Sequence, residues 1–294
     1  MLMRIKKFLC VIAFVIILNS CAYSGERSLL KFGLLSKLNS SEQEFAETWK
    51  KTFAPNNRNF DIILRFYESL INMLMGLNAD EINEMVLPEA VAEYVLNVNS
   101  DLTASLVLNS GGMGLAFGFR ADNKELRDKF NEAILNLKNN WTLSALEGLY
   151  IASPGIGEPE PVKFEKFKKA GTIKVAVTGD LPPIDLITAS GVPAGFNTAV
   201  LAEIGNYLKM NVELIEINSG ARNAALASGR ADVVFWYEID NTKEIQPDIP
   251  DGIILSSPYY EWNKFIHVRK KLKADNKENW DVRKNLLMLY STPR

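Results

Sequence analysis

Cysteine and histidine are scarce in this sequence, which has two cysteines and one histidine in 294 residues. Both cysteines, Cys10 and Cys21, lie near the amino terminus, so the rest of the chain has no thiol for a disulfide, for thiolate catalysis or for a metal. The one histidine, His267, lies in an apolar stretch, which favours a packed or exposed ring over a catalytic one. Nucleophile elbows, phosphate-binding glycine loops and metal-ligand spacings are missing. We therefore expect no enzyme activity, cofactor or metal.

An excess of positive charge is also lacking. The chain has 33 Lys and Arg against 35 Asp and Glu, a formal net charge of −2. Removal of residues 1–20, which hold three positive charges and no negative one, would leave a net charge of −5. With no basic block apparent in the sequence, this balance argues against nucleic acid as a partner.

No apolar run is long enough to cross a bilayer. A basic start is followed by apolar residues from Phe8 to Leu18, whereas a hydrocarbon core of roughly 30 Å needs about 20 residues. This pattern predicts an export signal over residues 1–20. The signal ends in Leu-Asn-Ser-Cys and resembles that of bacterial lipoproteins, which implies a lipid anchor on Cys21 and a polar tether over 21–28. Ordinary secretion, with Cys21 unmodified, is the alternative.

The first half of the chain mixes helical and extended patterns. Over residues 60–79 the apolar positions recur every three or four residues and predict one buried helical stripe, formed by Ile63, Phe66, Leu70, Leu74 and Leu77. A short strand that stops at Pro88 and a strand over 113–119 are expected next. Asp122 with Glu125 predicts a capping box at the start of the following helix.

A stretch rich in proline and glycine, residues 153–163, is predicted to be a linker. Beyond it, strands and helices alternate. The expected bounds are 172–178, 211–217 and 231–236 for the strands and 197–208 and 219–228 for the helices. This alternation implies a parallel α/β sheet with right-handed crossovers.

Ligands of open parallel sheets bind at the carboxyl ends of the strands. The first of these strands ends in Gly-Asp-Leu-Pro-Pro, which contains Asp180, and the third ends in Phe-Trp-Tyr-Glu, which contains Trp236, Tyr237 and Glu238. We expect Asp180, Trp236 and Tyr237 to line a ligand site. The alternatives are internal packing for the two aromatic residues and a turn-forming role for Asp180.

Several motifs resemble one family in their order and spacing. GTIKVAVTGDLPP, GVPAGFNTAVLAEIGNYLKMNVELIEI, ARNAALASGRADVVF and SSPYY are similar to the first lobe of bacterial extracellular solute-binding proteins, family 3. FYESLINMLMGLNADEINEMVLPEAVAEYVL resembles the second lobe, and MGLAFGFRADNKELRDKFNEAILNLKNNWTLSALEGLYI resembles the segment that returns to the first lobe. The resemblance implies a two-lobe, periplasmic-binding-protein-like (type II) α/β clamshell with parallel-sheet, Rossmann-like lobes.

These portions stand in reverse order, which implies a circularly permuted chain. A remnant of a tandem array is the alternative. The expected division is a second-lobe segment over 29–110, a closing segment over 111–152, the linker over 153–163, a first-lobe segment over 164–268 and a tail over 269–294.

Members of this family mostly hold amino acids or similar small polar solutes between the lobes and close by a hinge motion. Their ligand carboxylate usually pairs with an Arg after the third strand, where this sequence has Lys243. Their ammonium-binding Asp corresponds to Pro88, with Glu89 next to it. Arg222 and Arg120 are other candidate anion partners. The residues expected to contact the ligand are Asp180, Arg222, Trp236, Tyr237 and Tyr259.

The resemblance thus implies a monomeric substrate-binding lipoprotein of the cell envelope, facing the periplasm or the exterior. It would capture a small polar, amino-acid-like solute for the permease of an ABC transporter. Two other functions stay open. One is a ligand-sensing or degenerate binding module without a transport role, and the other is a dehydratase that uses Glu238 or Asp180 as its carboxylate.

Overall fold

The computed structural model describes residues 28–36, 42–43, 46–47, 60–152, 159, 161–240 and 249–271. The predicted export signal, Cys21, nearly all of the tether, most of the linker, Lys243 and nearly all of the tail lie outside these residues. Within the described part of the chain, no helix is long and apolar enough to cross a membrane.

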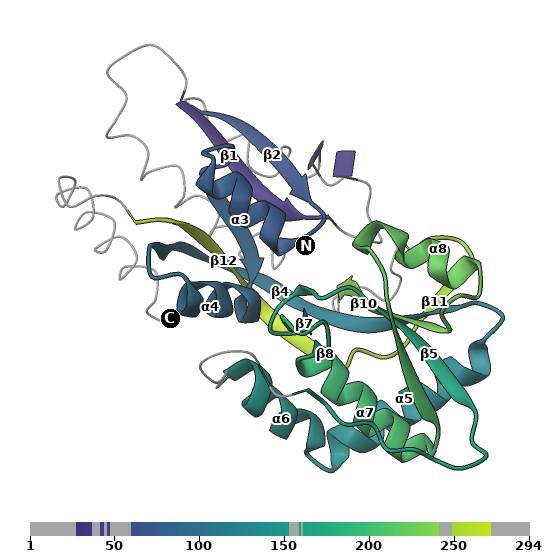
Figure 1. Cartoon of the computed structure of the whole chain (residues 1–294). Coiled ribbons are helices and arrows are strands. Elements are labelled where there is room, and N and C mark those ends of the chain that lie inside the picture. The colour runs from purple at the N-terminus through teal and green to yellow at the C-terminus, as the bar shows by residue number, and fades with distance from the viewer. Residues whose placement is uncertain are drawn as a thin grey trace, which may run out of the picture.

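One curved sheet runs through the molecule (Figure 1). Its strands lie in the order β2, β1, β3, β12, β4, β10, β5 and β9, and β11 pairs with β4. Their bounds are Ser28–Leu35 for β1, Phe60–Tyr67 for β2, Glu84–Pro88 for β3, Leu102–Arg120 for β4, Thr172–Val177 for β5, Asn211–Glu216 for β9, Val233–Asp240 for β10, Ile253–Leu255 for β11 and Tyr260–Lys270 for β12. A small second sheet contains β6 (Asp180–Leu181), β7 (Asp185–Ile187) and β8 (Pro193–Ala194).

The main sheet has two parallel ends and an antiparallel middle. β2, β1 and β3 are parallel at one end, and β10, β5 and β9 are parallel at the other. Between them, β12 and β4 are antiparallel to each other and to their outer neighbours. β4 and β12 therefore join an amino lobe, built on β1–β3, to a carboxy lobe, built on β5, β9 and β10. The expected two-lobe α/β fold is confirmed, with a sheet that is parallel within each lobe and antiparallel where the chain crosses.

Helices cover both lobes. The amino lobe carries α3 (Leu70–Asn78) and α4 (Glu89–Val98). In the carboxy lobe α5 and α6 contact α7 on one face of the sheet, and α8 packs on the opposite face. Their bounds are Lys124–Asn139 for α5, Thr142–Glu147 for α6, Phe196–Leu208 for α7 and Arg222–Ala227 for α8, with a π-helix, η3, at Gly148–Ala152 and a 3-10 turn, η4, at Ser219–Ala221.

The elements predicted after the linker agree with the structure. The strands over 172–178 and 211–217 are β5 and β9, and the helix over 197–208 is α7. The helix over 219–228 corresponds to η4 followed by α8. The third strand, β10, starts two residues later than expected and extends to Asp240.

The single helix predicted over residues 60–79 is wrong. Phe60–Tyr67 forms β2, and only Leu70–Asn78 forms α3, whose N-cap Ser69 accepts a hydrogen bond from the backbone N–H of Asn72 at 3.3 Å. The β2 sequence is rich in isoleucine and aromatic residues, which suit a strand. Short apolar runs fit both periods, so spacing alone could not separate the two elements.

The capping box predicted for Asp122 and Glu125 is also wrong. Asn123 is the N-cap of α5, and its side chain makes no cap hydrogen bond. The strand predicted over 113–119 is the end of the much longer β4.

One hydrophobic core extends from lobe to lobe. It includes Met85 and Leu87 of β3, Val200 and Ile204 of α7, and Phe117 of β4. Aromatic side chains on the crossing strands connect the two ends, since Tyr260 and Trp262 of β12 belong to the same cluster. Burial of large apolar side chains in both lobes therefore fixes the crossing strands between them.

Candidate functional site

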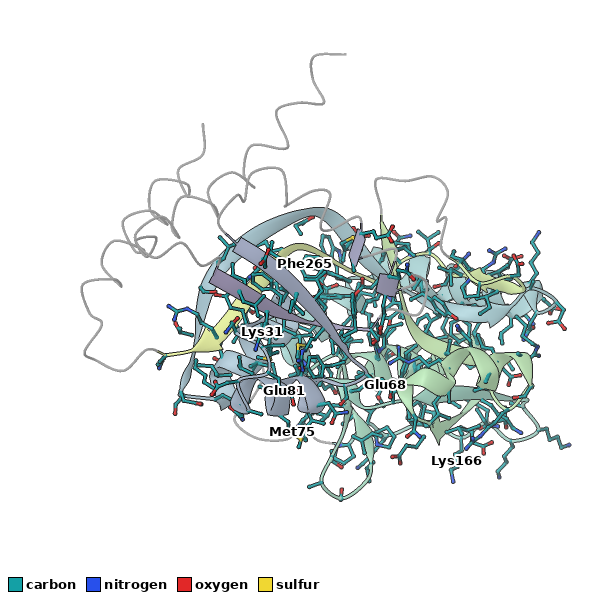
Figure 2. All side chains as sticks on the ribbon, turned by 90° about the horizontal axis from the view of Figure 1, so that it is seen from above. Lys31, Glu68, Met75, Glu81, Lys166 and Phe265 are labelled. Atoms are coloured by element: carbon teal, nitrogen blue, oxygen red, sulfur yellow. The ribbon has the colours of Figure 1, made fainter. Side chains whose placement is uncertain are left out.

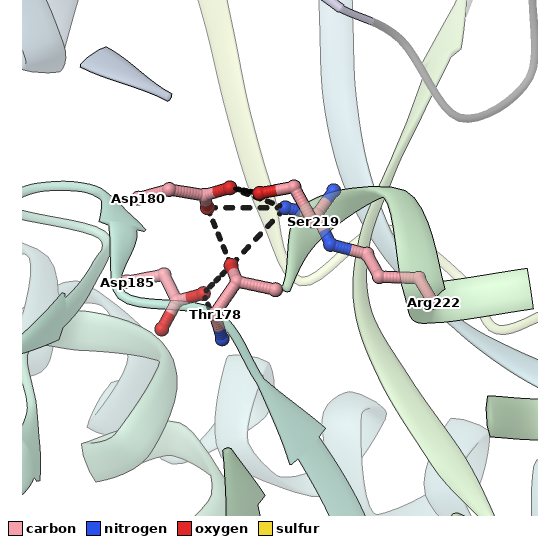
Figure 3. A network of polar contacts seen from close by, with 5 residues as sticks. All are labelled: Thr178, Asp180, Asp185, Ser219 and Arg222. Carbon is pink, nitrogen blue, oxygen red and sulfur yellow. Dashed lines mark hydrogen bonds and ion pairs between the residues drawn. The ribbon is translucent and has the colours of Figure 1, made fainter. Parts of the chain in front are cut away.

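The predicted binding residues lie where β5 and β9 end. These strands are parallel neighbours, so their carboxyl ends meet at one edge of the carboxy lobe. β5 continues into Thr178 and Asp180, and β9 continues through η4 into Arg222 at the start of α8. Figure 3 shows that these turns bring Thr178, Asp180, Asp185, Ser219 and Arg222 into one polar network.

Asp180 and Arg222 form a buried ion pair at the centre of this network. The guanidinium Nη2 lies 3.0 Å from Oδ1 and 3.1 Å from Oδ2 of the carboxylate. The two side chains are 7% and 2% exposed. The hydroxyl of Ser219 donates to the same carboxylate, and Nη2 also donates to Oγ1 of Thr178 at 3.1 Å. Asp180 thus has charged and neutral donors around both of its oxygens.

Thr178 connects this pair to a second acid, Asp185. The Thr178 hydroxyl contacts the carboxyl groups of Asp180 and Asp185, the latter at 2.8 Å, and its backbone N–H donates to Asp185 at 3.2 Å. A hydroxyl has one proton, so it cannot donate to both carboxylates at once. At a pH where Asp185 is protonated this conflict disappears, because the O–H of Asp185 can then donate to Oγ1 of Thr178.

The pKa of Asp185 is raised to about 6, chiefly because the side chain is completely buried. The negative charge of Asp180 raises this pKa further, whereas hydrogen bonds from Thr178 and the charge of Arg222 lower it. The site therefore contains a carboxyl group that changes its charge close to neutral pH.

Trp236 forms an aromatic wall beside the ion pair. The guanidinium carbon of Arg222 lies 4.3 Å from the centre of its ring, a cation–π contact. The register between β10 and β4 shifts between Val234 and Tyr237, where two residues of β10, Phe235 and Trp236, lie opposite one residue of β4, Phe117. This bulge changes the alternation, so that Trp236 packs in the main core while Tyr237 packs on the α8 side.

Tyr237 supports the other side of α8. Its ring lies against Gly118 so closely that a Cβ there would be 2.3 Å from a ring carbon. Its hydroxyl donates to the side chain of Asn223, the residue after Arg222. Burial raises the pKa of Tyr237, so the phenol keeps its proton and acts as a donor.

Tyr259 lies on the main-core side of the site. Its ring stacks on Phe117 with 4.1 Å between ring centres, and its hydroxyl donates to Oδ1 of Asn197 at 2.9 Å. Burial is the main reason that the pKa of Tyr259 is raised well above its usual value, and the nearby charge of Asp185 adds to this effect.

The amino lobe approaches the network from the opposite side. α3 contacts β6, the strand that contains Asp180, and Leu70 at the start of α3 is buried. A Cβ on Gly220 of η4 would lie 3.5 Å from a carboxylate oxygen of Glu68. Figure 2 shows Glu68 where the end of β2 faces the carboxy lobe. The network therefore lies at the junction of the two lobes.

Of the five predicted ligand residues, Arg222 contacts both Asp180, through the ion pair, and Trp236, through the cation–π contact. Tyr237 bonds to Asn223, the residue after Arg222, and Tyr259 bonds to Asn197. All five residues make contacts within the protein. Internal packing, the alternative considered for the aromatic residues, is therefore also present in the structure. The sequence did not single out Thr178, Asp185 and Ser219, which complete the network, or Asn197, which bonds to Tyr259. The signal for three of them was their place next to a strand end, within Thr-Gly-Asp-Leu-Pro-Pro-Ile-Asp and Asn-Ser-Gly-Ala-Arg.

The other candidates lie outside the network. Arg120 donates to the carbonyl oxygens of Leu226 and Ala231 at 3.3 and 3.2 Å, which fastens the end of β4 to α8. Glu89 forms an ion pair with Lys264, whose Nζ lies 2.7 Å from Oε1 of the carboxylate. His267 is buried, with Nδ1 3.0 Å from the carboxylate of Glu84, so of the two expected environments, packed or exposed, the ring has the packed one.

Two α/β lobes joined by two crossing strands, with a polar network at their junction, define a two-lobe binding-protein fold. Residues 173–286 match the model of the family "bacterial extracellular solute-binding proteins, family 3". This match confirms the resemblance inferred from the sequence for the carboxy-lobe segment. No curated relative matches the sequence.

Several solved structures are similar in shape. The ligand-binding component of an ABC-type import system from Staphylococcus aureus has a TM-score of 0.44 at 11% identity, covering 89% of this chain and 70% of that one. The methionine binding protein MetQ has a TM-score of 0.41 at 14% identity, covering 90% of each chain. The glutamate-bound GluR0 core from Nostoc punctiforme has a TM-score of 0.39 at 11% identity, covering 88% and 93%.

Proposed function

We propose that this protein captures a small polar, amino-acid-like solute between its lobes and delivers it to the permease of an ABC transporter. In the same proposal the mature chain is anchored to a membrane by a lipid on Cys21 and faces the periplasm or the exterior. The family match of residues 173–286 supports the binding role.

Unpartnered polar atoms in a buried cluster are the observation that carries this proposal. Among the described residues, Oδ1 of Asp185, Nε of Arg222 and Nε1 of Trp236 are buried and have no hydrogen-bond partner. Such atoms are costly unless something satisfies them. Three of them around one ion pair, at the junction of the lobes, are the donors and acceptors that a bound solute would use.

The charges of the network favour one end of an amino-acid-like ligand. Arg222 is already paired with Asp180, so a ligand carboxylate would have to displace that side chain. With Asp185 ionised, the network has two carboxylates and one guanidinium. We infer that Oδ1 of Asp185 accepts from the ammonium group of the solute, and that Nε of Arg222 and Nε1 of Trp236, which are donors, bind an oxygen atom of the solute. The main partner of a ligand carboxylate would then lie elsewhere between the lobes.

Entry of a solute requires the lobes to separate. Asp180, Arg222 and Trp236 are almost fully buried, and α3 of the amino lobe contacts β6. Since β4 and β12 connect the sheets of the two lobes, bending of these strands is the motion that would open the site.

The order of the elements supports a circular permutation. The chain builds β1–β3 first, crosses on β4 to α5 and α6, then builds β5–β11, and crosses back on β12. α5 and α6 contact α7 although the predicted linker separates them in sequence. A single clamshell built from both halves accounts for these contacts, whereas two incomplete modules would leave the halves unpaired.

A ligand screen tests the proposed function. The melting temperature and the tryptophan fluorescence would be measured with amino acids, oligopeptides, polyamines and organic acids. We expect a ligand with an ammonium group to raise the melting temperature and to change the fluorescence. Trp236→Phe should remove the fluorescence change, and Trp141→Phe, which alters a side chain that is 76% exposed, should keep it. The proposal fails if no ligand class shifts the melting temperature.

A further inference from the structure

Four lysines stand close together in the segment that precedes β5. Residues 163–169 read Lys-Phe-Glu-Lys-Phe-Lys-Lys. Phe164 and Phe167 are half-buried, and Phe164 packs against the main core. Lys163, Lys166, Lys168 and Lys169 are exposed. The two rings therefore anchor the segment while the ammonium groups point to solvent, as the position of Lys166 at the edge of the carboxy lobe illustrates (Figure 2).

The backbone of this segment is held in place by Asn211 of β9. The side chain of Asn211 accepts from the N–H of Phe167 at 3.0 Å and donates to its carbonyl oxygen at 3.2 Å. The N–H of Asn211 donates to the carbonyl of Gly171 at 2.9 Å. These bonds fix the lysine backbone, so less conformational entropy is lost when the side chains meet a partner.

Lys209, at the end of α7, adds a fifth positive charge. Its Nζ lies 5.5 Å from the ring centre of Phe167. We call Lys163, Lys166, Lys168, Lys169 and Lys209 the lysine surface. Within the part of the chain that the structure describes, none of the five forms an ion pair, whereas Lys129, Lys264 and Lys270 each pair with an acid. Glu165 is the one acid inside the segment, which leaves four net positive charges.

The lysine surface contradicts the impression that the sequence has no basic block. The whole chain has a formal net charge of −2. Since the lysine surface together with Glu165 contributes +4, the remaining residues have a net charge of −6. A molecule of this kind is attracted to a negative surface through one face only and is repelled through the others.

The geometry points to an anionic lipid bilayer as the partner of the lysine surface. Lysine clusters bind the negative surface of such a bilayer without needing a specific pocket. Nucleic acid fits less well, because Phe164 and Phe167 are turned inward and offer no exposed ring for base stacking.

The position of this surface agrees with access to the proposed ligand site. The lysine segment and Asn211 lie at the amino ends of β5 and β9, whereas the polar network lies at their carboxyl ends. A six-residue strand is about 20 Å long. A bilayer on the lysine surface would therefore leave the carboxyl edge of the carboxy lobe uncovered.

Vesicle co-sedimentation tests this inference. The chain from residue 21 onward, with Cys21→Ser to prevent acylation, keeps every described residue. Its binding would be measured to phosphatidylcholine vesicles with and without 30% phosphatidylglycerol, at low and high salt. The test variant carries Lys163→Gln, Lys166→Gln, Lys168→Gln and Lys169→Gln. The control variant makes the same change at Lys124, Lys129, Lys138 and Lys264.

We expect binding to anionic vesicles only, weakened by salt and reduced at least tenfold in the test variant but not in the control variant. Thermal unfolding would show that both variants fold. Equal binding to neutral vesicles, equal losses in the two variants, or preferential binding to an oligonucleotide would each overturn the inference. Solute binding at the lobe junction is a separate measurement, so the two proposals can fail independently.

Discussion

Asp180 and Arg222, 42 positions apart in sequence, share a buried ion pair in which Nη2 lies 3.0 Å from Oδ1. Removing one partner of such a pair leaves a charge without compensation in a poorly solvated place. The pair therefore governs both the stability of the carboxy lobe and the charge that a ligand would meet.

Asp180→Asn should reduce the free energy of unfolding by about 3 kcal/mol, because Arg222 loses its nearest counter-ion while Asp185 stays to compensate in part. Urea denaturation at pH 7 measures this loss. Asp180→Ala combined with Arg222→Met should recover most of the stability, since neither member of the ion pair is then left without its partner. Asp251→Asn, at an exposed acid, serves as the control. A double variant less stable than Asp180→Asn would contradict a dominant role of the pair.

The protein should lose stability as the pH rises from about 4 to about 6, through the titration of Asp185. The pKa of Asp185 is raised to about 6 in the folded state, so between these values the folded chain binds more protons than the unfolded chain. The destabilisation should reach about 3 kcal/mol above pH 6. Asp185→Asn should remove this contribution. Identical pH profiles for the two proteins, measured by urea denaturation, would count against it.

Gly118→Ala should destabilise the protein by about 1–3 kcal/mol, because the new methyl group would overlap the ring of Tyr237. Gly148→Ala is a matched control, since a Cβ there meets nothing within 4 Å and the backbone is helical. The control should be neutral or slightly stabilising. The melting temperatures of the two variants would be compared. Equal changes would show that contact with Tyr237 is not the reason why position 118 needs a glycine.

Tyr259→Phe should cost about 1–2 kcal/mol, because the buried Oδ1 of Asn197 loses its donor. Tyr207→Phe removes a similar bond, to Glu132, at an exposed position and should change stability by less than about 0.5 kcal/mol. Urea denaturation of both variants provides the comparison. A loss in Tyr207→Phe as large as that in Tyr259→Phe would argue against burial as the cause.

The sequence predicted the carboxy lobe better than the amino lobe for a physical reason. In residues 172–236, Gly and Pro mark the turns, and the apolar positions switch clearly between strand and helix periods. In residues 60–79 only Glu68 and Ser69 separate the strand Phe60–Tyr67 from the helix Leu70–Asn78, and neither is Gly or Pro. Phe60–Tyr67 is a strand because it pairs with β1, and the paired residues are 32 positions apart. The sequence around residues 60–67 does not reveal such a distant pairing.

Candidate site residues could be found from sequence only where they follow a strand. Asp180 follows the end of β5, so its place at the sheet edge was predictable, whereas Trp236 lies within β10 and not at the strand end that the sequence predicted. Asp185 lies in a mainly apolar stretch, and its importance comes from complete burial beside Thr178 and Asp180. The pairing of the Arg222 charge with Asp180 could not be predicted from the sequence either, since it depends on a contact between two different turns.

The sequence by itself determined the alternation of strands and helices in the carboxy lobe, the turns that end its strands and the family resemblance, because these depend on neighbours along the chain. The tertiary structure decided that both halves share one sheet, that Arg222 is paired with Asp180, and that Lys209 lies beside the lysine-rich segment 163–169. Pairing, burial and charge density depend on distances in space, and only the folded chain sets those distances.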